Sequence, residues 1–340
     1  MLTQRPLLFA SFCVLALSIT LPIEAQPQPG GAAIQAAELA RMRTYINTRN
    51  DPRIVLKVIH VAEGEDIDCL DETRQLGYDK PVKLAVLPKE LLQNLKTTNL
   101  PPDARPATQA YGVTTELCPA HTVPRAHVSL EQVKAFGTLD MFDKKFSGTS
   151  RAWAPTVAGN CCHEYAHASK SVTDVRGVQT VMSINKPSDE HSEEFSLSQL
   201  WVTGEPGFAN QETVEAGWQV ARWRHPGVAD PDNRRPYFFI YHSWNQYNNG
   251  CYDTGCGFIT QTGTTHAPGT AFTSWSTVGG TQVYSTLEVI RDSSGNWWIV
   301  VDNDWVGYYP ASNFHTPGLP AGASLIDLGA AHARSMVDVT

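Results

Sequence analysis

Short runs of alternating apolar and polar residues recur from about residue 157 onward, and clusters of Gly, Pro, Asn and Asp separate them. A period of two is typical of a strand with one buried face, and frequent turn residues favour antiparallel pairing. The pattern predicts strands over residues 178–184, 195–202, 213–223, 237–241, 257–261, 282–291, 297–302, 305–310 and 324–330. So many short strands indicate a mainly β fold, an antiparallel β-sandwich of two sheets.

The chain before residue 150 has a mixed α/β pattern. Apolar residues at helical spacing predict a short helix over residues 34–47, and Ser129 is placed to cap a second helix over residues 129–136. The predicted organisation is a linker and short helix over residues 26–50, a smaller α/β region over 51–150, and the β-sandwich domain over 155–340.

The first 25 residues have the features of a secretory signal peptide. Arg5 provides a basic start, residues 7–21 are mostly apolar, and Ile23-Glu24-Ala25 offers a small-residue cleavage site. The apolar stretch contains Ser and Thr and is shorter than the roughly 20 residues that a membrane span needs. We therefore expect residues 1–25 to be removed on export, and we expect a secreted protein without a membrane partner.

Charge and cysteine content narrow the function further. The net charge is −8 and no dense Lys/Arg tract occurs, which argues against a nucleic-acid partner. Six cysteines follow the predicted signal peptide, and an even number in an oxidising compartment predicts disulfides. Cys251 and Cys256 are the first candidate pair, because only four residues of a Gly-rich turn separate them.

A zinc-peptidase pattern is present at His163-Glu164-Tyr165-Ala166-His167. In H-E-x-x-H enzymes, two His residues one helical turn apart bind Zn²⁺ and the Glu acts as general base. The flanking residues give no strong helix signal, and Glu190, Glu193 and Glu194 are equally eligible as a third ligand. We therefore expect a strand or loop with two surface histidines and no bound metal, with a zinc-dependent hydrolase as an alternative.

A second candidate site lies on the predicted strand around Glu215. Alternation places Val214, Ala216, Trp218 and Val220 on one face, and Glu215, Gly217 and Gln219 on the other. A Glu can activate water and a Gln can polarise a carbonyl group, which is the equipment of a hydrolytic site. The same alternation places Gln199 with the aromatic residues Phe195 and Trp201, so a hydrogen-bonding role is expected for Gln199.

Aromatic residues are dense near the C-terminus, at Trp297-Trp298, Trp305 and Tyr308-Tyr309. Such residues are more often part of a core than of a binding site. The alternative is an aromatic groove for a Pro-rich peptide. The candidate substrate-binding residues are Trp201, Trp218 and Tyr308.

The chain resembles neprosin, a family of glutamic endopeptidases that cleave after proline. The N-terminal part of the resemblance consists of Ile67-Asp68-Cys69-Leu70-Asp71, Tyr78-Asp79-Lys80-Pro81 and Cys118-Pro119, which are similar to the activation peptide of the family. The C-terminal part consists, in order, of His163-Glu164-Tyr165-Ala166, residues 195–201, residues 215–220, Gly250-Cys251 through Cys256-Gly257-Phe258, residues 295–298 and residues 307–311. Together these motifs extend over most of the mature chain.

The resemblance implies an acid-acting peptidase, without a cofactor, whose β-sandwich carries two catalytic glutamates. Glu215 matches the first glutamate, whereas Ala331 stands where the second is expected. Gln219, Gln199 and Asp327 are then the candidate groups to compensate for the missing acid. The resemblance also implies that Cys69 pairs with Cys118. A relative that binds peptides or cell-wall polymers without cleaving them is the second alternative.

Overall fold

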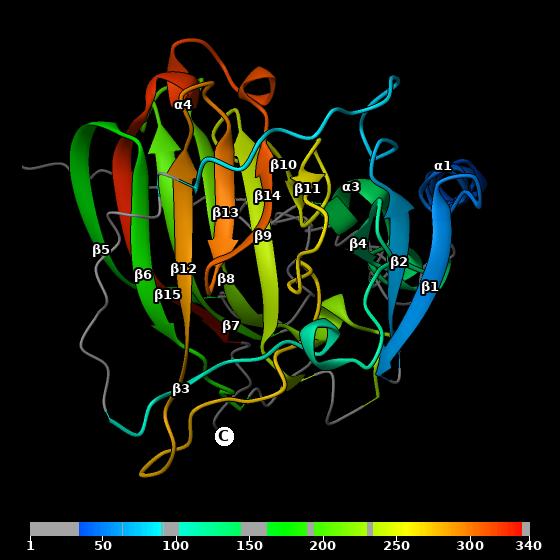
Figure 1. The fold of residues 1–340 in the computed structure, drawn as a ribbon, viewed down its shortest axis with the longest axis horizontal. Coiled ribbons are helices and arrows are strands. Elements are labelled where there is room, and N and C mark those ends of the chain that lie inside the picture. Colours follow the sequence, from blue (N-terminus) through cyan, green and yellow to red (C-terminus); the bar gives the residue numbers. More distant parts are fainter. Residues whose placement is uncertain are drawn as a thin grey trace, which may run out of the picture.

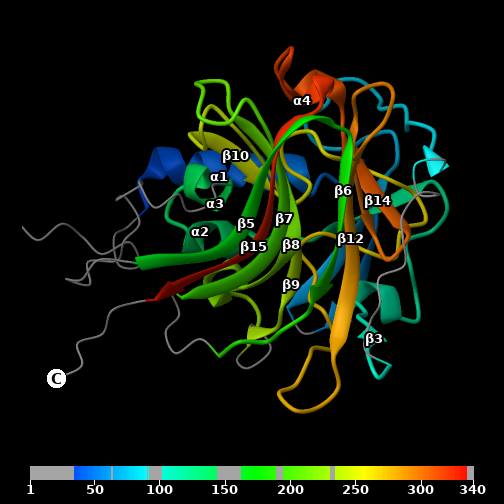
Figure 2. The ribbon, with the colours of Figure 1, turned by 90° about the vertical axis from the view of Figure 1, so that its left-hand side faces the viewer.

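Two β-sheets packed face to face form the larger part of the molecule (Figure 1). The computed structural model describes residues 34–62, 64–89, 91, 102–143, 162–188, 194–229 and 234–334. The predicted signal peptide and Cys161 lie outside the described residues. Figure 2, turned by 90°, shows the two sheets as separate layers. The predicted β-sandwich is therefore confirmed.

The first sheet has the strand order β10-β9-β8-β7-β15-β5 and is antiparallel throughout. Its strands are β5 (Cys162–Val175), β7 (Phe195–Gly204), β8 (Glu212–Val220), β9 (Tyr237–Trp244), β10 (Asn249–Tyr252) and β15 (Ala323–Arg334). Helix α4 (Gly318–Ala321) precedes β15. The central strands come from the most strongly alternating stretches of the sequence.

The second sheet has the order β11-β14-β13-β12-β3, and β6 also pairs with β12. Its strands are β3 (Arg105–Pro106), β6 (Gly177–Ser183), β11 (Ile259–Thr260), β12 (Val283–Arg291), β13 (Trp297–Val301) and β14 (Asp304–Tyr309). The main core lies between the sheets, where Leu200, Val214 and Ala216 of the first sheet belong to one apolar cluster with Val289 and Ile299 of the second. Burial of this apolar surface is the principal force that holds the layers together.

The N-terminal region forms a smaller α/β unit beside the sandwich (Figure 1). It contains α1 (Ala36–Arg49), α2 (Leu130–Ala135), α3 (Leu139–Asp143) and a three-stranded sheet of β1 (Val55–Ala62), β2 (Glu65–Asp71) and β4 (Thr122–Ala126). Ser129 caps α2 in a reciprocal capping box with Gln132, so the predicted helix start is confirmed. The described residues include no helix long and apolar enough to span a membrane.

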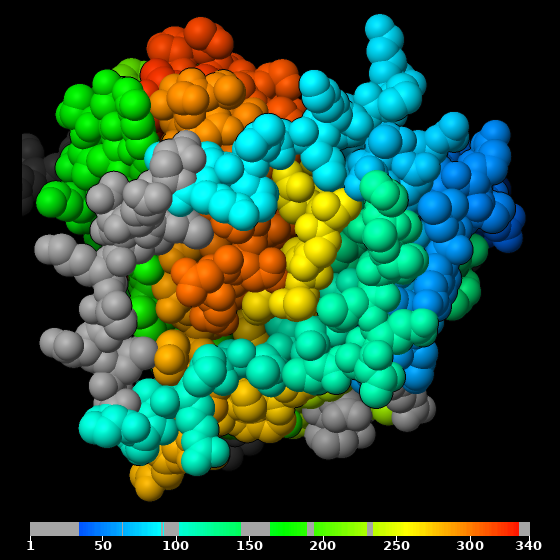
Figure 3. Space-filling view, viewed as in Figure 1, coloured from blue at the N-terminus to red at the C-terminus, as the bar shows by residue number. Residues whose placement is uncertain are grey.

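A long segment of the N-terminal region crosses the outer face of the second sheet. Residues 78–89, here called the strap, pack over Trp298, Trp305 and Tyr308, and Figure 3 shows them as cyan atoms lying across the orange strands. The Tyr78 hydroxyl donates to Gly257 O at 2.6 Å, and Ala85 N–H donates to the Tyr308 hydroxyl at 3.1 Å. Strand β3 continues this contact by pairing in parallel with β12.

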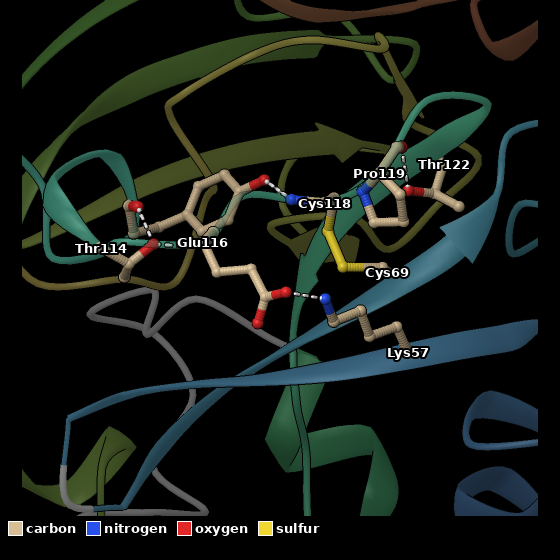
Figure 4. Close-up of a disulfide and its surroundings, with 8 residues drawn as sticks. Lys57, Cys69, Thr114, Glu116, Cys118, Pro119 and Thr122 are labelled. Carbon is tan, nitrogen blue, oxygen red and sulfur yellow. Dashed lines mark hydrogen bonds and ion pairs between the residues drawn. A yellow bond between two sulfur atoms is a disulfide. The ribbon is translucent and has the colours of Figure 1, made fainter.

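Both disulfides that the sequence suggested are present, Cys251–Cys256 and Cys69–Cys118. Figure 4 shows the second, which joins β2 to the segment after the 3₁₀ turn η2 (Tyr111–Val113). Close to it, the Tyr111 hydroxyl accepts a bond from Cys118 N–H at 3.1 Å. The bridge therefore closes a loop of the small N-terminal sheet around a buried tyrosine.

Candidate functional site

The candidate residues lie on the face of the first sheet that points away from the second sheet. Register pairs Glu215 of β8 with Trp201 of β7, and Trp201 with Asp327 of β15. Side chains of directly paired residues share a face, so these three form one row across the sheet. Two strand spacings put the Cα atoms of Glu215 and Asp327 about 10 Å apart. Asp327 is thus much closer to Glu215 than its position in the sequence suggests.

The carboxylate of Glu215 is fully buried and fixed by hydroxyl groups. Its Oε1 accepts hydrogen bonds from the Thr213 hydroxyl at 2.8 Å and from the Tyr247 hydroxyl at 2.8 Å. Burial and the neighbouring charge of Glu215 hold the pKa of Tyr247 well above its usual value. Tyr247 therefore stays protonated and is a permanent donor to Glu215.

The next row across the sheet combines glutamine with two glycines. It consists of Gly217, Gln199, Gly329 and His167. A Cβ on Gly217 would lie 2.7 Å from Gln199 Cα and would overlap Ser198 O, so the close approach of β7 and β8 requires glycine there. Gln199 and Gln219 are both buried on this face. Their side chains therefore lie on the same sheet face as Glu215, Gln199 in the next row and Gln219 one row further on.

Asp327 belongs to a small polar cluster with two residues of β5. Its Oδ1 lies 3.1 Å from His167 Nδ1 and also accepts a hydrogen bond from the Ser169 hydroxyl. The ring of His167 stacks on Trp201 with ring centroids 5.8 Å apart. Asp327 is almost fully buried, whereas 40% of the His167 side chain is exposed. His167 and Ser169 are therefore the exposed members of the cluster.

Ala331 occupies the apolar end of the same face. It pairs with Leu197 of β7, which in turn pairs with Gln219 of β8, so it lies in the row of Gln219 and not in that of Glu215. It packs in an apolar cluster with Phe195, Leu197, Ala221, Phe239, Tyr241 and Tyr252. The position that should carry a second glutamate is thus lined by apolar side chains in this chain.

Two of the candidate substrate-binding residues do not join this site. Trp218 lies on the opposite face of β8, inside the core between the sheets, where its indole N–H donates to Ser183 O at 2.9 Å. Tyr308 lies on the second sheet under the strap. Both assignments are corrected, because a ligand near Glu215 cannot contact either side chain. Trp201 does lie on the face of Glu215.

The zinc pattern is part of strand β5 and not of a helix. On a strand, residues four positions apart are about 13 Å from each other, whereas one helical turn brings them close enough to share an ion. Among the described residues, no group of three His, Cys, Asp or Glu side chains could hold a metal ion. Strand geometry therefore removes the basis for the zinc hydrolase alternative.

Thr213, Tyr247 and the contact of His167 with Asp327 were missed at the sequence level. Thr213 shares a strand face with Glu215, so alternation alone would have identified it. Tyr247 follows Asn245 and Gln246 in a turn whose three residues all have positive φ, and no sequence pattern connects that turn to Glu215. The contact of His167 depends on the pairing of β5 with β15, two strands far apart in the sequence.

Fold and site together define a β-sandwich protein that carries buried carboxyl and amide groups on the outer face of one sheet. Residues 192–332 match the Neprosin family model, which agrees with the resemblance that the motifs of this part of the sequence indicated. The match runs from β7 into β15, of which it leaves out the last two residues, and it includes every candidate residue of the site except His167 and Ser169. It supports a peptidase-like function for this domain.

Comparison with solved structures gives distant similarities. Two crystal structures of scytalido-glutamic peptidase, each with a transition-state analogue, are 11% and 10% identical, with TM-scores of 0.29 and 0.28. The β-porphyranase BpGH16B from the human gut bacterium Bacteroides plebeius is 7% identical, with a TM-score of 0.18. The matches cover 50%, 50% and 52% of this chain and 65% of each of those chains, slightly less than two thirds of their length.

Proposed function

We propose that this protein is a secreted peptidase that cleaves proline-containing peptides in acid, with Glu215 as the group that takes a proton from water. The observation that carries the proposal is that Glu215 shares one sheet face with Gln199, Gln219 and Asp327, within the part of the chain that matches the Neprosin family. Secretion is supported by the signal-peptide features of residues 1–25 and by two disulfides, which are typical of oxidising compartments.

The chemistry assigns different tasks to the polar groups of the site. A carboxylate held by two hydroxyl donors is a suitable general base for water, and an amide N–H of Gln199 or Gln219 can stabilise the oxyanion that forms at the scissile carbonyl. The buried apolar cluster around Ala331 borders these groups, and it could receive the ring of a proline residue only after the segments that cover it move. An acid optimum follows from the need for a protonated donor together with an ionised Glu215.

Complete burial of Glu215 adds one requirement to the proposal. With no exposed surface, its carboxylate cannot contact a substrate in the conformation described. The groups that cover it must therefore move before a peptide binds. An activity that increases after limited proteolysis or after incubation in acid would agree with this requirement.

The test measures cleavage of a proline-containing peptide by the purified protein across a pH series from acid to neutral. Glu215→Gln should lower kcat/KM by about 100-fold or more, because it removes the general base while preserving shape. Glu288→Gln is the matched control, since Glu288 is an equally buried glutamate on the second sheet. Full activity of Glu215→Gln would refute the proposal.

A non-catalytic role in peptide binding is the second candidate function, favoured by the apolar surroundings of Ala331. The natural protein and Glu215→Gln also distinguish peptide cleavage from peptide binding without cleavage. Absence of cleavage at every pH, together with binding of a Pro-rich peptide to both the natural protein and Glu215→Gln, would support the binding role. Ala331→Glu extends the comparison, because a gain of activity in acid would show that this position still faces a functional site.

A further inference from the structure

The imidazole of His167 leans across the sheet toward strand β7. His167 belongs to edge strand β5, and strand β15 separates it from Trp201 of β7. Its ring nevertheless stacks on Trp201, at an interplanar angle of 26°. Gly329 of β15 makes this possible, because a Cβ at that position would overlap His167 Cβ. The ring is thereby placed beside the residue that pairs directly with Glu215.

Asp327 fixes the orientation of this ring. It contacts Nδ1, and since the two nitrogens of an imidazole point in divergent directions, Nε2 faces away from Asp327. Ser169 contacts the same nitrogen at 3.1 Å, so it is not placed as a nucleophile activated by Nε2. Asp327 itself is 3% exposed, so the exposed members of this cluster are His167 and Ser169.

We propose that His167, oriented by Asp327, is the proton donor of the site and takes the place of the carboxyl group that is absent at Ala331. The inference rests on the proposed peptidase function and adds to it the identity of the second acid–base group. Asp327 is in this view a positioning residue, since it acts through its contact with the His167 ring. The resemblance to neprosin does not include His167.

The proposed reaction balances as follows. Glu215 removes a proton from water, and the water oxygen forms a bond to the scissile carbonyl carbon. Protonated His167 then gives its Nε2 proton to the amide nitrogen as the carbon–nitrogen bond breaks, which leaves an acid and an amine. Transfer of the proton from Glu215 through solvent to His167 restores both groups. General acid assistance of this kind contributes about 100- to 10,000-fold.

Several ionisable groups share this face of the first sheet with His167. The carboxyl groups are Asp327 from β15 and Glu215 from β8. The phenols that share this face are Tyr165 from β5, Tyr237 and Tyr241 from β9, and Tyr247 from the following turn. Partial desolvation of its hydroxyl and the charge of Glu215 raise the pKa of Tyr165, so this phenol is neutral over the relevant pH range.

The first test compares pH profiles of kcat/KM. His167→Gln should lose about 100-fold or more at the optimum and should lose the decline that accompanies deprotonation of the imidazolium. Asp327→Asn should keep substantial activity but move that decline to lower pH, because an imidazolium beside a neutral amide gives up its proton more readily. His332→Gln is the control. His332 is also hydrogen-bonded to a serine, but it follows Ala331 on β15, so it points to the face opposite to that of Asp327 and Ala331.

A second measurement does not require activity. The imidazole resonances of the protein are recorded by NMR across pH, with His167 assigned by its absence in His167→Gln. The inference requires its titration midpoint to fall in Asp327→Asn and to stay unchanged in His332→Gln. Equal midpoints in the natural protein and Asp327→Asn would overturn it.

The outcomes for the two proposals are separable. A natural protein that cleaves peptides while His167→Gln shows the same rate and pH profile would leave the peptidase function intact and remove His167 from it. If neither protein cleaves any peptide, the peptidase function fails and the proton-donor role fails with it. The NMR result then decides only whether Asp327 holds the imidazolium.

Discussion

Gly217 and Glu288 show how single positions constrain the two sheets. Gly217 lies beside Glu215, where β7 approaches β8 so closely that no side chain fits. Glu288 is buried on the second sheet, where one carboxylate oxygen accepts a hydrogen bond from Gln179 and the other has no partner among the described residues. The constraint at Gly217 is the lack of space for a side chain, and the constraint at Glu288 is the burial of an ionisable carboxyl group. Stability after substitution tests the first, and the pH dependence of stability tests the second.

Gly217→Ala should destabilise the fold by about 1–3 kcal/mol, because the new methyl group forces backbone atoms of β7 to move. Gly227→Ala is the matched control, since a Cβ at that position meets nothing within 4 Å. Urea denaturation of both variants checks the prediction. Equal stability of the two variants would mean that β7 and β8 are spaced more loosely than described.

Burial raises the pKa of Glu288 to about 7. A carboxyl group whose pKa is higher in the folded than in the unfolded state stabilises the fold fully below its unfolded pKa and loses that contribution as pH rises through the folded pKa. The side chain of Glu288→Gln cannot ionise, so the variant does not lose this stability as pH rises. Relative to the natural protein, the variant should therefore gain stability between about pH 4.5 and 7 and show no further gain above that range.

Denaturation with urea at several pH values measures this difference. The comparison with the natural protein is essential, because the buried histidines His225 and His242 have lowered pKa values and change stability in the opposite direction. A pH-independent difference between Glu288→Gln and the natural protein would contradict the assignment.

Among the elements, the central strands follow from the sequence and the edge strand β5 does not. Strands β7 and β8 alternate clearly because one of their faces meets the apolar core. In β5, residues 164–171 are exposed on both faces, so no alternation marks them as a strand. The common face of Glu215 and Gln219 was predictable from alternation, whereas the position of Gln199 on that face and the row that joins Glu215 to Asp327 depend on cross-strand register.

The alternation of apolar and polar residues already indicated that Trp218 lies on the core face of its strand and not on the face of Glu215. The sequence already placed it with Val214 and Ala216, opposite Glu215, and the structure confirms that face. Its assignment to substrate binding relied on its aromatic character. A strand face read from periodicity is thus a stronger constraint on a site than the chemical type of a side chain.

The two disulfides should contribute unequally to stability. Cys69–Cys118 spans 49 positions and Cys251–Cys256 spans 5. In the loop-entropy description, replacing both cysteines of a pair by Ala should cost about 4 kcal/mol for the first pair and about 2 kcal/mol for the second. Denaturation of the two double variants under non-reducing conditions gives the comparison. A larger loss for the short loop would point to a local role of that bridge in its turn.

For the whole molecule, the strap and β3 integrate the N-terminal region with the sandwich. The strap covers the aromatic side chains of the second sheet, and Gln75 exchanges two hydrogen bonds with the backbone of Thr260, at 2.9 and 2.7 Å. The predicted boundary near residue 150 therefore separates segments of sequence that are in extensive contact. Contacts of this kind are not visible in local sequence patterns.

A chain restricted to residues 144–340 should expose Trp298, Trp305 and Tyr308, because it lacks the strap. We expect stronger binding of an apolar dye and self-association of this shorter chain. Dye fluorescence and light scattering, compared with the full chain at equal concentration, provide the measurement. Unchanged dye binding and a monodisperse shorter chain would show that the sandwich can close this face by itself.

Strand β5 has a consequence for behaviour at high concentration. It pairs with β15 on one side, and no described strand pairs with its other side. A row of backbone donors and acceptors at a sheet border can recruit a further strand from another molecule. Glu164 and Lys170 are exposed on this strand, and charged side chains of this kind oppose such recruitment. Colloidal stability of the protein thus depends in part on two charges that have no role in its core.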